Sequence, residues 1–149
     1  MADTRIQHEA EAWVIEHGLQ SVFPGTSFRG AKLPLTWGGL FNFDAVSSDG
    51  EIVCAISTSA AKTATGKSAS AKYQKLKTDA LYLLNLKVEA RRVMIFTELS
   101  MYEYFQKERL TGRFPSNIEL LHTALPDELH ARVLVVRELA SKETSPAKA

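Results

Sequence analysis

The sequence has one cysteine and no long apolar run. The single cysteine, Cys54, excludes an internal disulfide framework, and its apolar surroundings predict a small buried side chain. No stretch approaches the roughly 18 apolar residues that a membrane helix needs, and the polar N-terminus lacks a signal-peptide pattern. We therefore expect a cytoplasmic protein that has no contact with a membrane.

Neither sign of charge dominates, because the chain has 18 lysines and arginines and 17 aspartates and glutamates. Global charge thus gives no argument for nucleic acid, and any such argument must rest on local clustering. A chain of 149 residues that is 45% hydrophobic is typical of one globular domain. We predict a single domain over residues 1–141 and a disordered polar tail over residues 142–149.

In the first half of the chain, patterning predicts a helix and then a hairpin. Apolar residues recur at helical spacing over residues 3–17, and Gly18 supplies a stop. Residues 19–39 carry so many glycines and prolines that we expect an irregular connection. Strand-like runs at 40–47 and 51–58 flank the turn sequence Ser48-Asp49-Gly50, which predicts an antiparallel hairpin.

The second half alternates helices with short apolar runs. We predict helices over residues 72–87, 100–110 and 126–141, and strands over residues 92–98 and 118–125. The order of elements predicts an α/β (α+β) domain with a central mixed sheet of four to five strands flanked by helices.

Asp44 is the residue in the hairpin that needs an explanation. It lies in mid-strand between Phe43 and Ala45, where burying a carboxylate without a partner is costly. A metal ion, a basic side chain or a position at the rim of the sheet would each relieve that cost. Asp44 is therefore the first candidate for a functional group.

The surrounding order of elements resembles the PD-(D/E)XK nuclease superfamily, whose fold is restriction-endonuclease-like. The resemblance consists of a helix with a glutamate, then the strand FDAVSSDG from Phe43, then the strand IVCAISTS from Ile52. The helix with Lys75 and Asp79 and the run RVMIFTE from Arg92 follow in the same order. It covers about residues 5–100 and rests on short motifs.

The resemblance implies a metal-dependent endonuclease or exonuclease that acts on DNA. In that family two carboxylates hold a divalent cation, typically Mg²⁺, which activates water and neutralises charge on the phosphate. Asp44 would be the first metal ligand, and Glu9 would be the accessory carboxylate from the first helix. Glu16 is a second possibility for that role, whereas we expect Glu11 to point away from the apolar face of the helix.

The second strand departs from the family pattern. Ala55 stands where the family has the second acid, and Ser57 stands where it has a lysine. In this superfamily such groups sometimes move to neighbouring elements, so Lys67, Lys72 or Lys75 could supply the ammonium. We therefore take Asp44, Lys72, Lys67 and Ser57 as the candidate catalytic set, and we keep a non-catalytic DNA- or protein-binding module as the alternative.

The one clearly basic stretch follows the hairpin. Its lysines occur with no acid among them before Asp79, and small flexible residues surround them. This composition suits contacts with DNA phosphates. Tyr73 is its only aromatic residue, so this stretch does not predict base stacking. The candidate nucleic-acid contacts are Lys62, Lys67, Lys72 and Lys75.

Three other features leave alternatives open. Residues 61–68 match a relaxed phosphate-binding loop with Lys67, which makes nucleotide binding a further alternative. Trp37 beside Gly38 and Gly39 could pack over the hairpin or recognise a ligand at the surface. The apolar run at residues 134–139 either packs on the sheet or offers a face to a homodimer or another protein partner.

Overall fold

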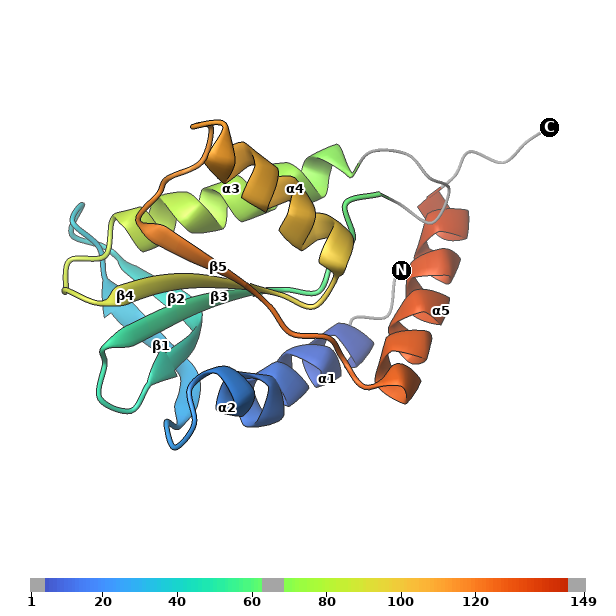
Figure 1. Cartoon of the computed structure of the whole chain (residues 1–149), viewed down its shortest axis with the longest axis horizontal. Helices are drawn as coiled ribbons and strands as arrows, with labels where there is room; N and C mark the ends of the chain where they lie inside the picture. The colour runs from blue at the N-terminus through green and yellow to red at the C-terminus, as the bar shows by residue number, and fades with distance from the viewer. Residues whose placement is uncertain (1–4, 63–68, 145–149) are drawn as a thin grey trace.

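A five-stranded mixed sheet forms the centre of the molecule (Figure 1). The computed structural model describes residues 5–62 and 69–144. The strands lie in the order β1-β2-β3-β4-β5, so each strand pairs with its neighbours in the sequence. The strands are β1 (Phe28–Pro34), β2 (Leu40–Ser47), β3 (Ile52–Ser57), β4 (Arg91–Phe96) and β5 (Ile118–His122). The predicted α/β domain with a mixed sheet is confirmed.

The sheet changes from antiparallel to parallel pairing at β3. The pairs β1–β2 and β2–β3 are antiparallel, whereas β3–β4 and β4–β5 are parallel. The predicted hairpin is confirmed, and Gly50 closes its turn with a φ of 74° that favours glycine. Asp49 fixes the same turn, because its Oδ1 accepts hydrogen bonds from the Ser47 hydroxyl and the Glu51 amide.

Helices cover both faces of the sheet (Figure 1). On one face, α3 (Ser70–Leu84) and α4 (Leu99–Leu110) pack over a core that includes Phe43, Ala55 and Phe96. On the other face lie α1 (Arg5–Trp13), the π-helical turn η1 (Val14–Gly18), α2 (Leu19–Val22) and α5 (Asp127–Thr144). None of the helices over residues 5–62 and 69–144 combines the length and apolar character of a membrane span.

The predicted helix stop at Gly18 is wrong. The chain stays helical through η1 and α2 as far as Val22. A Cβ atom at Gly18 would lie 3.1 Å from Thr123 and 3.2 Å from the ring of Trp13. Gly18 therefore lets the helix pass close to the segment between β5 and α5, and its role is in packing.

The prediction of an irregular connection over residues 19–39 is also wrong, because it contains β1. This strand lies at the edge of the sheet, where a proline and a glycine cost less than in a central strand. Pro34 closes the strand, and Gly30 lies where the pairing with β2 shifts by one residue. The punctuating residues therefore mark an edge strand and its irregularity.

The remaining elements differ from prediction mainly at their ends. Helix α3 begins at Ser70 and ends at Leu84, and β5 ends at His122. Helix α5 extends to Thr144, three residues into the stretch that was predicted to be a disordered tail. Residues 145–149 of that stretch lie outside the described residues.

Candidate functional site

Asp44 lies at a β-bulge in the middle of β2. The pairing with β1 shifts from Arg29–Val46 to Ala31–Phe43, so that Asp44 and Ala45 together stand opposite Gly30 alone. Phe43 belongs to the core under α3 and α4, whereas Ala45 belongs to the core against α1. The register between β2 and β3 extends only over Ala45–Cys54 and Val46–Val53. The two strands therefore part at Asp44.

The Asp44 side chain accepts a hydrogen bond from β3 at the point where the backbone pairing between β2 and β3 has ended. Its Oδ2 accepts a hydrogen bond from the Ile56 amide at 2.8 Å, on the side of β3 that faces β2. Burial raises the pKa of the half-buried carboxyl above its ordinary value, while the Ile56 amide and the charge of Lys75 lower the pKa. Burial has the larger effect, so the charged form of Asp44 is disfavoured by the fold.

Helix α3 contributes a lysine and a second acid to this region. Lys75 Nζ lies 3.3 Å from Asp79 Oδ2, one helical turn further along the same face. The lysine side chain is 68% exposed, whereas the Asp79 side chain is only 14% exposed. Burial raises the pKa of Asp79, the neighbouring Lys75 lowers the pKa, and the charge of Asp44 raises the pKa again.

Helix α1 contributes Glu11 from the opposite face of the sheet. This side chain is half-buried. Burial raises the pKa of Glu11 most, the charge of Asp44 raises it further, and His8 and Lys75 lower it. Glu11 is therefore the glutamate of α1 whose ionisation depends on Asp44, although the sequence pattern led us to expect that it points away.

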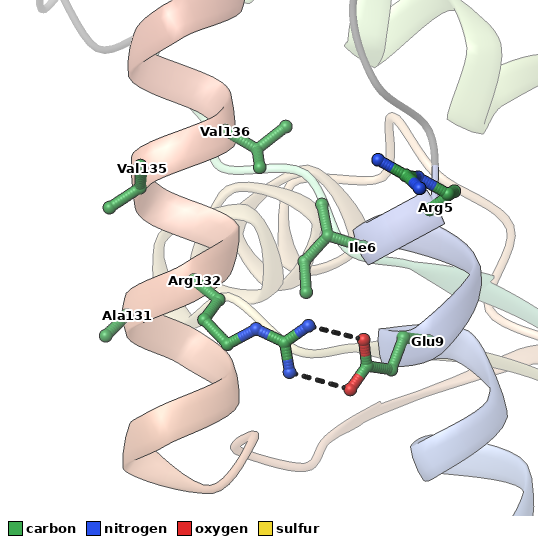
Figure 2. A pocket seen from close by; sticks show the side chains of 7 residues that line it. All are labelled: Arg5, Ile6, Glu9, Ala131, Arg132, Val135 and Val136. Carbon is green, nitrogen blue, oxygen red and sulfur yellow. Dashed lines mark hydrogen bonds and ion pairs between the residues drawn. The ribbon is translucent and has the colours of Figure 1, made fainter.

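Glu9, the accessory carboxylate expected from the resemblance, serves a different contact (Figure 2). Its two carboxylate oxygens accept hydrogen bonds from the two terminal nitrogens of Arg132 on α5, both at 2.8 Å. This pair spans an open groove of about 640 Å³ between α1 and α5. The alternative acid, Glu16, lies exposed with its carboxylate 3.9 Å from His17.

Helix geometry explains why the expected distinction, with Glu9 beside the apolar face and Glu11 pointing away from it, is wrong. At 3.6 residues per turn, the two glutamates lie about 100° to either side of the buried Ala10. Both therefore border the apolar face. Helix α5 binds Glu9 through Arg132. The charges of Asp44 on β2 and Lys75 on α3 act on Glu11.

The two positions of β3 that depart from the family pattern are buried. Ala55 is packed in the core under α3 and α4, and Ser57 is 5% exposed. The Ser57 hydroxyl accepts a hydrogen bond from the Ser59 amide at 3.3 Å. At these two positions β3 therefore offers neither an acid nor an amine, and any replacement has to come from the helices.

The predicted lysines are placed differently from one another. Lys75 is the lysine whose charge acts on Asp44 and Glu11. Lys72 lies exposed one turn earlier on α3, and Lys62 is exposed after β3. Lys67 and most of the candidate phosphate-binding loop, residues 63–68, lie outside the described residues.

The resulting region has three carboxyl groups of raised pKa and one ammonium group. Glu11, Asp44 and Asp79 come from three different elements, and Lys75 is the cation that acts on all of them. When the carboxyls are ionised, the region carries an excess of negative charge. Perturbed groups of this kind gather at functional sites, where a bound cation or a shared proton relieves the repulsion.

Oxygen donors of this kind suit a hard cation such as Mg²⁺. Over the described ranges, no three or more His, Cys, Asp or Glu side chains are grouped so that they could hold a metal ion. Among these described residues, one ion would therefore have one or two carboxylates as ligands. That number fits Mg²⁺, which keeps several waters and takes one or two carboxylates together with substrate phosphates.

A second polar cluster lies at the carboxyl ends of β3 and β4. His130 Nε2 lies 3.1 Å from Glu98 Oε1, and Arg137 donates to the same oxygen at 3.1 Å and to the Thr58 carbonyl at 2.8 Å. The Glu98 side chain is 12% exposed. No sequence pattern indicates this cluster, because its members are up to 79 residues apart and share no motif. The cluster attaches α5 to the sheet.

Cys54 is expected to be unreactive in the folded protein. Its side chain is fully buried, and burial together with the charge of Asp44 raises the pKa of the thiol to about 12. Since the thiolate is the reactive form, we expect no labelling by a disulfide reagent at pH 8 under native conditions and full labelling in denaturant. Rapid labelling of the native protein would contradict the described packing.

No family model, no curated protein and no solved structure matches this chain.

Proposed function

We propose that this chain is a PD-(D/E)XK-type, nuclease-like domain that binds DNA with the help of Mg²⁺ held by Asp44 and Glu11 beside Lys75. The observation that carries the proposal is the position of Asp44. It lies where β2 parts from β3, and its charge is coupled to groups on α1 and α3. The restriction-endonuclease-like fold and DNA as the ligand are part of the proposal.

The order of elements supports this proposal. The helix α1, the hairpin of β2 and β3, the helix α3 and the strand β4, which is parallel to β3, follow one another in the order that the resemblance implies. The edge strand β1 precedes the hairpin in addition. Lys75 supports it as well, because an ammonium from α3 acts on Asp44 although β3 carries Ser57 in place of a lysine.

Electrostatics favours binding that depends on a cation. A phosphate is repelled by Glu11, Asp44 and Asp79 when they are ionised, and Lys75 alone cannot balance them. A divalent ion would remove this repulsion and would supply Lewis-acid activation of a phosphate and its attacking water. Lys75, and the exposed Lys72 and Lys62, would contact neighbouring phosphates.

Lysine replacements test the proposal. We expect Lys75→Ala to reduce affinity for a labelled oligonucleotide in Mg²⁺ by about tenfold and to lower the slope of log affinity against log salt by about one. Lys107→Ala is the matched control, because Lys107 is an exposed lysine on α4, outside the proposed site. Fluorescence anisotropy measures both variants, and equal affinities would reject this site.

The second candidate function is a module that binds DNA or protein without cleaving DNA. The burial of Ala55 and Ser57 favours it, because the usual catalytic positions of β3 carry no acid or amine. Incubation with plasmid and single-stranded DNA in Mg²⁺ or Mn²⁺ distinguishes the two candidates. Cleavage that is lost in Lys75→Ala indicates a nuclease, whereas binding without cleavage indicates the module.

Nucleotide binding through residues 61–68 stays a prediction, since most of that loop lies outside the described residues. Its test is thermal stabilisation by a nucleotide that is abolished in Lys67→Ala.

A further inference from the structure

The turn between β1 and β2 exposes two large apolar side chains. Trp37 is 60% exposed, and Leu40, at the start of β2, is 67% exposed. The other tryptophan, Trp13, lies half-buried on α1. An indole exposed to solvent has no role in the core, so the presence of Trp37 in this turn is better explained by contact with a ligand.

Hydrogen bonds hold this turn in one conformation. The Leu35 amide donates to the Gly39 carbonyl at 2.8 Å, and the Gly38 amide donates to the Leu35 carbonyl at 3.0 Å. Thr36 is tied to α3's end, because its amide donates to the Asn85 carbonyl at 2.8 Å and its hydroxyl donates to Asn85 Oδ1 at 3.0 Å. Gly38 has a φ of 98°, which favours glycine. The turn is therefore preorganised.

An aromatic stack supports the indole. The rings of Trp37 and Tyr82 meet in a T-shaped contact with centroids 6.0 Å apart, and Tyr82 stacks on Phe41 with centroids 4.1 Å apart. A contact of this kind orients the ring, and Trp37 is still 60% exposed. Trp37 is thus positioned as a flat platform at the surface.

The elements that carry the proposed site, α3 and β2, also lead to the Trp37 platform. Lys75, Asp79 and Tyr82 share one face of α3, and seven residues of helix separate Lys75 from Tyr82 by about 10 Å. On β2, the four steps between the five residues from Leu40 to Asp44 span about 13 Å. These lengths correspond to about three or four base steps at 3.4 Å each.

Lysines flank the platform. Lys32 is exposed on β1, opposite Asn42, and Lys87 is exposed where its amide donates to the Pro34 carbonyl at the end of β1. An exposed ring with lysines on the neighbouring segments suits unpaired nucleotides, since every base has a face to stack and every nucleotide carries a phosphate.

We propose that Trp37 stacks on a base of a single-stranded segment whose backbone passes the Asp44–Lys75 site. This inference rests on the proposed function, and it adds a preference for unpaired DNA that the site alone does not give. The basic stretch after the hairpin did not suggest stacking, because the platform comes from a turn distant in sequence.

Tryptophan fluorescence tests the inference. Trp13→Phe leaves Trp37 as the sole tryptophan, since the chain has two. Titration of this variant with a 12-nucleotide oligothymidylate in Mg²⁺ should quench the fluorescence, and Trp37→Ala should weaken binding about tenfold. Trp37→Phe should restore most of the affinity because it keeps a ring, and Leu40→Ala, an apolar loss in the same patch, should change it less than twofold.

Three results would overturn the inference. Binding that depends on Mg²⁺ and Asp44 but leaves Trp37 fluorescence and the Trp37→Ala affinity unchanged rejects stacking alone and keeps the proposed function. An absence of binding to oligothymidylate by a native chain that binds duplex DNA rejects the inference, and an absence of binding to either DNA rejects the proposed function as well. Quenching that follows protein concentration instead of oligonucleotide assigns the patch to a contact between proteins. Equal melting temperatures of Trp37→Ala and the native chain verify that the variant is folded.

Discussion

Replacing Asp44 by alanine is expected to lower the free energy of unfolding by about 2 kcal/mol, whereas replacing it by asparagine should not lower it. The Asp44 carboxylate accepts the amide of Ile56, and Ile56 is 3% exposed. Alanine leaves that buried amide without an acceptor, while asparagine offers an amide oxygen of similar reach. Urea unfolding of the two variants and the native chain measures the difference.

The stability of Asp44→Asn relative to the native chain should change with pH in a definite direction. The folded state raises the pKa of Asp44 above the ordinary value of 3.8. The carboxyl group's contribution to stability is therefore fully present below pH 3.8 and is lost as pH rises through the raised pKa. Asparagine has no proton to lose, so the variant should gain on the native chain from about pH 4 toward neutrality. A native chain that gains on the variant over that range would show that an additional partner stabilises the carboxylate.

Replacing Glu98 by alanine should cost about 3 kcal/mol, because it removes the carboxylate that Arg137 and His130 share and leaves the Arg137 charge without its partner. Glu98 is mostly buried, and it receives hydrogen bonds from Arg137 and contacts His130 on α5. Without the carboxylate, Arg137 keeps only the Thr58 carbonyl. The loss should appear in urea unfolding and as faster amide exchange in α5.

A matched control separates this effect from the removal of any nearby acid. Glu103 is exposed on α4, the helix that Glu98 immediately precedes, so Glu103→Ala should change stability by less than about 0.5 kcal/mol. Glu98→Gln should fall between the two, since it keeps an acceptor but loses the charge. If Glu98→Ala and Glu103→Ala had equal stability, the Glu98 cluster would not attach α5 to the sheet.

Much of the fold could be predicted because its signals are local. Ser48-Asp49-Gly50 between two apolar runs predicts a hairpin by itself, and the run at residues 92–98 predicts the buried strand β4. Strand β1 was missed because an edge strand tolerates Gly30 and Pro34 and needs no alternation of apolar residues. Its identity depends on pairing with β2, which no local pattern shows.

The candidate site could be predicted only in part. Asp44 was recognised because an acid in mid-strand is costly wherever the strand lies. The choice among lysines, and between Glu9 and Glu11, depends on which flank of a helix meets β2 or α5. That choice is made by tertiary packing, so only the structure singles out Lys75 among the predicted lysines and Glu11 among the glutamates of α1. The catalytic roles of Ser57, Lys67 and Lys72 stay predictions.

The most direct test of the account is a Mg²⁺ titration of thermal stability on the native chain and on Asp44→Asn. A ligand that binds the folded state at ten times its dissociation constant stabilises it by about 1.4 kcal/mol. We predict that Mg²⁺ raises the melting temperature of the native chain and leaves that of Asp44→Asn unchanged. Equal shifts in the two proteins, or no shift in either, would contradict a cation site at Asp44.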